Sequence, residues 1–160
     1  MSYQAPIPRP VPLSTHVSVT LRLADGTDDL LVRHVRLLRD CVALSQQRWG
    51  FSIEAAVVLP SEVQLLCNFP DPEFGVRGAI RLITSAFTRH VPGHHRGNHA
   101  AIWGDTIEIT EITNAIVAMR TAFIEDAPVR AGLVKQAQDW PYSSANNTTA
   151  QASGMGVAVA

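Results

Sequence analysis

The chain has 160 residues, a length typical of one domain with room for a sizeable hydrophobic core. Hydrophobic residues make up 46% of it and charged residues 17%, a balance that excludes an intrinsically disordered protein. The formal net charge of −1 argues against a strongly basic nucleic-acid-binding domain, so any DNA site would have to be a local patch.

The hydrophobic segments, the N-terminus and the cysteines of the sequence are those expected of an intracellular protein. No apolar run approaches the roughly 18 residues of a membrane span, and no basic segment followed by an apolar one marks a signal peptide. We therefore expect a soluble cytoplasmic protein with no membrane partner. Cys41 and Cys67 have apolar neighbours, which favours buried free thiols over a disulfide.

The chain divides into an arm, a folded body and a tail. Residues 1–13 carry four prolines at alternating positions, which favours an extended, flexible arm without ladder hydrogen bonds. Residues 14–145 form the predicted domain. Residues 146–160 are small and aperiodic, and we expect a flexible tail there.

Hydrophobic periodicity gives the order of the predicted elements, because apolar residues alternate in strands and recur every three or four positions in helices. In chain order these are a strand over 15–23, a helix over 29–49, strands over 51–58 and 63–68, a helix over 76–90, a strand over 105–111 and a helix over 113–125. The order β-α-β-β-α-β plus a C-terminal helix predicts an α+β fold, the ferredoxin-like sandwich, with helices on one face of an antiparallel sheet.

Turn residues set the predicted boundaries. Gly50 ends the first helix, and residues 70–75 form a loop before the second. Pro128 stops the last helix, and Gly132 allows a turn after it.

Two polar residues, Glu62 and Gln64, are two positions apart in the third predicted strand. Residues at this spacing point to the same face of a sheet, so the two side chains would lie side by side. Their oxygens could hold a hard divalent cation. A carboxylate on a sheet face is, however, commonly just solvated.

Three strings of residues occur in a distinctive order: L-P-S-E-V-Q over 59–64, F-I-E-D-A-P-V-R-A-G-L-V over 123–134 and W-P-Y-S-S over 140–144. Together with residues 15–22 and the pair Ile102-Trp103, they resemble the single-tyrosine transposases of the HUH superfamily, in particular the REP-associated tyrosine transposase branch. The resemblance covers residues 14–145.

The resemblance implies a ferredoxin-like fold, DNA transposition as the activity, and hairpin or single-stranded DNA as the partner. Members of the family use Mg²⁺ or Mn²⁺, held by a pair of histidines on a central strand. A tyrosine on a following helix attacks the scissile phosphate and becomes covalently linked to it. Two protomers often associate, so a homodimer is also expected.

This chain departs from the family at four positions. The histidine pair falls on Glu62 and Gln64, the tyrosine on Phe123, and a polar residue one turn later on Ala127. A phenyl ring has no oxygen with which to attack phosphorus, and Ala127 offers no ligand. Weak binding of a hard metal by Glu62 and Gln64 stays open, but metal without a nucleophile would not supply the family's reaction. We therefore expect no intact catalytic residue, no bound metal and a degenerate active site.

Residual DNA binding is the next question. The candidate contacts are five arginines: Arg22, Arg77, Arg81, Arg89 and Arg96. They could touch phosphates, or they could be an ordinary solvated surface. Glu62, if it lies in the old cleft, would add negative charge and weaken binding there.

The other polar and aromatic residues are weaker candidates. Tyr142 is expected to pack, and His16 to be an ordinary residue of a sheet face. Four histidines surround a glycine-containing loop and could bind a metal, although solvated or phosphate-facing histidines are more common there. They are His90, His94, His95 and His99.

Three functions remain open. The chain could be an inactive transposase relative that binds DNA, or a protein–protein interaction module that does not. It could also be an enzyme with a retuned metal site that uses Glu62 and a water nucleophile.

Overall fold

Four antiparallel strands form one sheet in the order β2-β3-β1-β4. The strands are β1 (His16–Arg22), β2 (Ser52–Val58), β3 (Glu62–Asn68) and β4 (Glu108–Ile112). The computed structural model describes residues 15–93 and 101–146. The predicted arm over 1–13, the tail from 147 onward and Arg96 lie outside the described residues.

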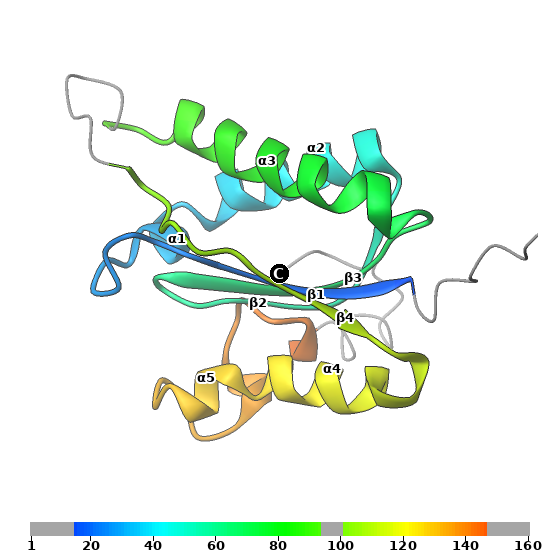
Figure 1. Cartoon of the computed structure of the whole chain (residues 1–160). Coiled ribbons are helices and arrows are strands. Elements are labelled where there is room, and N and C mark those ends of the chain that lie inside the picture. The colour runs from blue at the N-terminus through cyan, green and yellow to red at the C-terminus, as the bar shows by residue number, and fades with distance from the viewer. Residues whose placement is uncertain (1–14, 94–100, 147–160) are drawn as a thin grey trace, which may run out of the picture.

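Helices cover both faces of the sheet (Figure 1). On one face lie α2 (Val35–Trp49) and α3 (Pro72–His90), with the short α1 (Leu30–Arg33) leading into α2. On the other face lie α4 (Val117–Glu125), preceded by η1 (Asn114–Ile116), and α5 (Ala127–Arg130). The predicted ferredoxin-like sandwich is confirmed, and the C-terminal helix adds a third layer. Within the described ranges, no helix is both long and apolar enough to cross a membrane.

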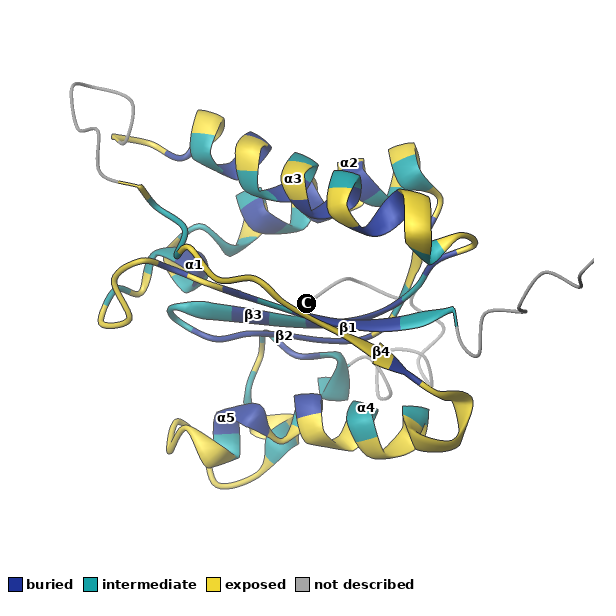
Figure 2. Cartoon of the chain, viewed as in Figure 1, coloured by how far each residue is buried: buried dark blue, intermediate teal, exposed yellow. Residues whose placement is uncertain are grey.

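Two hydrophobic cores follow from these layers. The larger lies between the sheet and α2 and α3, and it contains the alternating apolar residues of β1, namely Val17, Val19 and Leu21, together with Leu23 just after the strand. The smaller lies under α4 and includes Leu66, Ile112, Ile124 and Ala127. The sheet is therefore buried on both sides in its middle: Figure 2 shows dark stretches along β1, β2 and β3, whereas β4 is exposed along most of its length.

Two predicted helix boundaries in the first half of the chain are wrong. The helix expected over 29–49 is interrupted at His34, whose backbone angles (φ −118°, ψ 38°) leave the helical region. The loop expected over 70–75 is partly helix, since α3 begins at Pro72. Proline is well suited to the first turn, because its missing N–H has no helical partner there.

Two more boundaries differ near the C-terminus. The strand expected over 105–111 begins only at Glu108. The last helix ends at Glu125 as predicted, but its α-helical part begins only at Val117, after η1, and Pro128 lies in the first turn of α5 instead of stopping a helix. Gly132 has a left-handed backbone (φ 74°), as the predicted turn requires.

The W-P-Y-S-S string covers the outer edge of β2. The backbone N–H of Val58 donates to the carbonyl of Tyr142 (2.8 Å), and the indole N–H of Trp140 donates to the carbonyl of Val58 (2.8 Å). The backbone N–H of Ala56 donates to the hydroxyl of Ser144 (3.0 Å). This segment satisfies backbone groups that an edge strand would leave unpaired.

Candidate functional site

The four positions that depart from the family lie on the same side of the sheet. Side chains alternate along β3, so Val63 and Leu65 enter the larger core while Glu62, Gln64 and Leu66 face the α4 layer. Leu66 and Ala127 belong to the smaller core, and α4 packs against β2 and β3. Phe123 lies one turn before Ala127 along the chain. The fold therefore brings the four positions to one layer, as the resemblance implies.

Glu62 is held on both carboxylate oxygens. Arg22, directly opposite on β1, donates from Nε to Glu62 Oε1 at 2.6 Å. Gln64 donates from Nε2 to Glu62 Oε2 at 2.6 Å. The guanidinium of Arg22 also pairs with Glu108 of β4, with 2.9 Å between Nη1 and Oε1. One arginine thus links the ends of three strands, and the two predicted ligands bind each other.

The charges of this network stabilise one another. The hydrogen bond from Arg22 is the main cause that lowers the pKa of Glu108 below its ordinary value. The pKa of Arg22 is raised, chiefly by its hydrogen bond to Glu108 and also by the charge of Glu62. The side chain of Glu62 is 18% exposed and that of Glu108 is 53% exposed, so Glu62 is the better shielded carboxylate.

Phe123 is half exposed and lies between two arginines. The guanidinium carbon of Arg130 is 3.8 Å from the ring centroid, and that of Arg120 is 5.2 Å away. Both distances are within the range of cation–π attraction. Arg130 also pairs with Asp126 at 3.7 Å, a loose ion pair between exposed groups.

Ala127 is buried, with 4% of its surface exposed, among apolar side chains of the smaller core. The preceding turn is tied to the sheet, because the hydroxyl of Ser144 donates to Glu125 Oε2 at 2.6 Å and accepts from the backbone of Ala56. The position that carries a polar residue in the family is therefore part of a hydrophobic core here.

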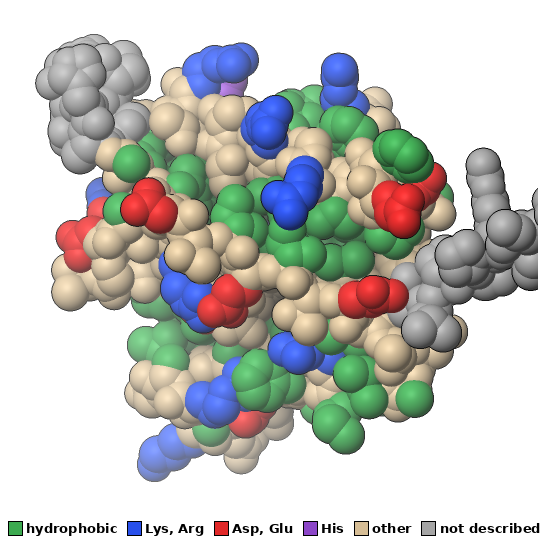
Figure 3. Space-filling model, viewed as in Figure 1, with side chains coloured by type: hydrophobic (Ala, Val, Ile, Leu, Met, Phe, Trp, Pro, Cys, Tyr) green, Lys and Arg blue, Asp and Glu red, His purple; other side chains and the backbone are tan. Residues whose placement is uncertain are grey.

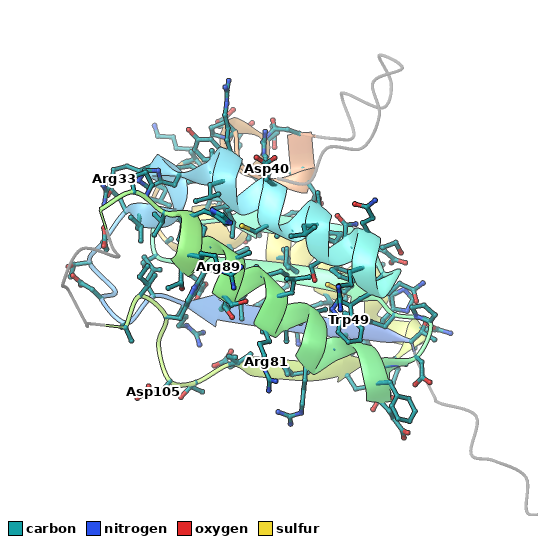
Figure 4. The ribbon with its side chains drawn as sticks, turned by 90° about the horizontal axis from the view of Figure 1, so that it is seen from above. Arg33, Asp40, Trp49, Arg81, Arg89 and Asp105 are labelled. Atoms are coloured by element: carbon teal, nitrogen blue, oxygen red, sulfur yellow. The ribbon has the colours of Figure 1, made fainter. Side chains whose placement is uncertain are left out.

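The four described arginines of the five predicted to contact DNA are divided between the two sides of the sheet. Arg77, Arg81 and Arg89 are exposed on α3, in the layer across the sheet from α4 (Figure 4 labels Arg81 and Arg89). Arg22 binds two carboxylates on the α4 side, and Arg96 lies outside the described residues. A role for these residues in DNA binding stays a prediction.

A cavity of about 420 Å³ lies between α3 and the segment that leads into β4. Arg22 and Arg89 both line it, together with the hydroxyls of Thr84 and Thr88 and the ring of Trp103. The indole of Trp103 donates to the backbone carbonyl of Thr84 at 3.1 Å and so fixes one wall. Two of the five predicted arginines therefore border the same cavity.

The minor candidates are placed as follows. Tyr142 packs on the larger core, with its ring edge-on to Trp140 at 5.5 Å, in keeping with the expected packing role. His16 lies in β1 and meets Glu54 at 2.7 Å. His90 ends α3, and His94, His95 and His99 lie outside the described residues. Among the residues that the structure describes, no group of three or more His, Cys, Asp or Glu is arranged to hold a metal. Both cysteines are buried and free.

Three residues of the site were missed from the sequence: Glu108, Arg120 and Arg130. Arg120 is three positions before Phe123 and Arg130 seven after it, spacings that place residues on one helical face and could have been noticed. Glu108 had no such signal, because its meeting with Arg22 depends on the pairing of β1 with β4.

Comparison with known proteins gives one group of relatives. The REP-associated tyrosine transposase of Escherichia coli K12 is 27% identical over 132 residues, which cover 82% of this chain and 77% of the relative. A Haemophilus influenzae protein named as a putative REP-associated tyrosine transposase is 25% identical over 134 residues, which cover 78% of this chain and 76% of the relative. No family model matches the chain.

A solved structure supports the fold. A REP-associated tyrosine transposase bound to a REP hairpin superposes with a TM-score of 0.77 at 23% identity, covering 98% of this chain and 92% of that one. The curated relatives, the shared fold and the matched strings agree with one another. The chain is therefore a relative of the REP-associated tyrosine transposases.

Proposed function

We propose that this protein is a catalytically inactive relative of the transposases that binds hairpin or single-stranded DNA. The inactivity is supported by the state of the site as a whole. Glu62 accepts hydrogen bonds from both Gln64 and Arg22, and a phenyl ring occupies the position expected for the nucleophile. Phe123 cannot form the phosphotyrosine bond, because it has no oxygen.

The residues present do not fit the family's divalent cation. Both oxygens of Glu62 are engaged, and the guanidinium of Arg22 already supplies the positive charge beside them. Gln64 turns its amide N–H groups toward Glu62, so its side chain acts as a donor there. Ala127 contributes no ligand. A retuned metal enzyme based on Glu62 would first have to remove Arg22 and turn Gln64.

DNA binding is supported by kinship. The curated relatives are named as transposases, and the superposed structure holds a REP hairpin. Arginines exposed on α3 and around Phe123 could neutralise phosphates on either side of the sheet. Because the chain has a net charge of −1, we expect modest affinity that weakens with salt.

The test combines binding with cleavage on the same DNA. Labelled hairpin and single-stranded oligonucleotides are incubated with the protein, with and without Mg²⁺ or Mn²⁺. We expect a mobility shift on native gels and no cleaved or protein-linked DNA on denaturing gels. Metal-dependent nicking with DNA attached to the protein would refute the inactivity, and the absence of any shift would refute the DNA binding.

A second candidate is a protein–protein interaction module. The observation that favours it is the exposure of Met119 on α4 and of Leu133 in the turn after α5, at 72% and 41%. Sedimentation of the purified protein checks this alternative. Self-association together with no DNA shift would favour it over the first.

A further inference from the structure

The outer surface of α4 and α5 is unusually apolar for a solvent-facing layer. Of the nine residues of α4, Ile124 alone is buried, whereas Met119 and Phe123 are exposed. Ile116 and Leu133 extend the exposed apolar surface at either end. Figure 3 shows hydrophobic and basic side chains next to each other over these helices. A surface that exposes apolar and basic side chains together is a candidate for binding a partner or a ligand.

The arrangement around Phe123 is more specific than an apolar patch. Its flat ring is 48% exposed, and the guanidinium of Arg130 lies 3.8 Å from its centroid. Arg120 lies on the same ring at 5.2 Å, and within the described part of the chain it has no carboxylate within 4.0 Å. The cluster therefore combines an aromatic plane with two cations, of which one is not neutralised.

We propose that Phe123, Arg120 and Arg130 form a stacking platform for an unpaired base of single-stranded nucleic acid. This inference rests on the proposed function and names the surface that would carry it. A base can stack on the exposed part of the phenyl ring or on the planar guanidinium of Arg130, since both are flat. The second arginine then neutralises a neighbouring phosphate.

Charge favours this occupant over another protein surface. Arg130 has one carboxylate partner here, Asp126, in a loose pair at 3.7 Å, and Arg120 has none within 4.0 Å among the described residues. An apolar protein partner would have to desolvate both guanidiniums, which is unfavourable without matching acids. A nucleic acid strand offers a phosphate for each cation and a ring for each flat face.

The test measures the affinity of a fluorescent oligothymidine strand for purified full-length protein by anisotropy. Phe123→Ala should weaken binding roughly 5- to 150-fold, the range found when an aromatic partner of a stacked base is removed. Phe123→Leu keeps an apolar side chain without a π face and should weaken binding similarly, whereas Phe123→Tyr should retain it. Phe74→Ala is the matched control, because Phe74 is 77% exposed on α3, across the sheet.

The arginines have their own readouts. Arg130→Lys keeps the charge but loses the plane, so affinity should fall several-fold with no change in salt dependence. Arg120→Ala removes a charge and should reduce the slope of log affinity against log salt by about 0.7. Thermal unfolding of each variant verifies that the fold is intact, and Phe123→Leu stands in for Phe123→Ala if the latter does not fold.

The possible results separate the two proposals. If the wild type binds the strand and the Phe123 variants bind equally well, the platform is refuted and the proposed DNA binding stands. If the wild type binds neither hairpin nor strand, both are refuted. If the Phe123 variants change self-association but leave DNA affinity unaltered, the surface joins two copies of the chain and the platform is again refuted.

Discussion

Replacing Ala127 by asparagine tests whether the interior of the smaller core can accept a polar group. In the family that the sequence resembles, a polar residue is expected at this position. In this protein the methyl group of Ala127 is 4% exposed and lies in one cluster with Val57, Leu66 and Ile124, each at most 1% exposed. None of these three neighbours has a side-chain atom that could bond to a carboxamide.

The expected cost follows from two contributions. Burying an amide without partners costs about 1–3 kcal/mol. The extra atoms must be fitted into a packed core, which costs about 1–3 kcal/mol more. The free energy of unfolding should therefore fall by roughly 2–6 kcal/mol, a large part of the ~5–15 kcal/mol available to a domain.

Urea unfolding followed by circular dichroism gives this difference from the shift in midpoint. Ala131→Asn is the control, because Ala131 is exposed just after α5 and reports the intrinsic effect of asparagine. Ala127→Val adds volume without polarity and separates packing from desolvation. If Ala127→Asn costs no more than Ala131→Asn, the cluster has room and partners for an amide, and the reasoning is wrong.

Three further predictions concern other parts of the chain. Gly78→Ala should lower the midpoint of thermal unfolding, because a Cβ there would lie 2.2 Å from the ring of Trp49; an unchanged or higher midpoint would contradict this close packing. Glu108→Gln should lower the stability of the protein only at pH values where Glu108 is ionised. Pairing with Arg22 lowers the pKa of Glu108, so the stability from this pair is present above the ordinary pKa of 4.5 and is lost as pH falls through the pKa of the folded protein. The wild type should therefore lose its advantage in melting temperature over Glu108→Gln below about pH 4.5, and a constant difference down to strong acid would count against the pairing. Burial raises the pKa of Cys67 to about 12, so iodoacetamide at pH 8 should modify it only after denaturation, as mass spectrometry of the digested protein would show; rapid labelling of the native protein would disprove its burial.

The fold was predictable because local periodicity and the order of elements carry it. The alternation in β1 identified the row that enters the larger core. It could not show that Ser18, in the polar row, is also buried at 5%, because that depends on the later α4 layer covering the second face. The interruption at His34 was equally invisible, since nothing in the apolar spacing changes there.

The site was predictable in its positions but not in its bonds. Comparison of motifs singled out Glu62, Gln64, Phe123 and Ala127, and the structure places all four on the α4 side of the sheet. The sequence suggested that Glu62 would be solvated or would add negative charge to the site, and it gave no sign that Arg22 would bind the carboxylate. Arg22 was likewise expected to be available for phosphates. Its pairing with Glu62 depends on the register between β1 and β3, and that register cannot be read from either strand alone.

These pairings change where a DNA strand is expected to lie. At the ends of β1, β3 and β4, Arg22 is shared between Glu62 and Glu108, which leaves an excess of one negative charge. Beside Phe123, Arg130 pairs with Asp126 and Arg120 has no carboxylate within 4.0 Å in the described part of the chain, which leaves an excess of one positive charge. Because phosphate contacts dominate the electrostatics of nucleic acid binding, we predict that a strand approaching this side contacts α4 and α5 rather than the ends of β1, β3 and β4. The two arginines beside Phe123 would then supply the phosphate contacts that the network around Glu62 does not offer.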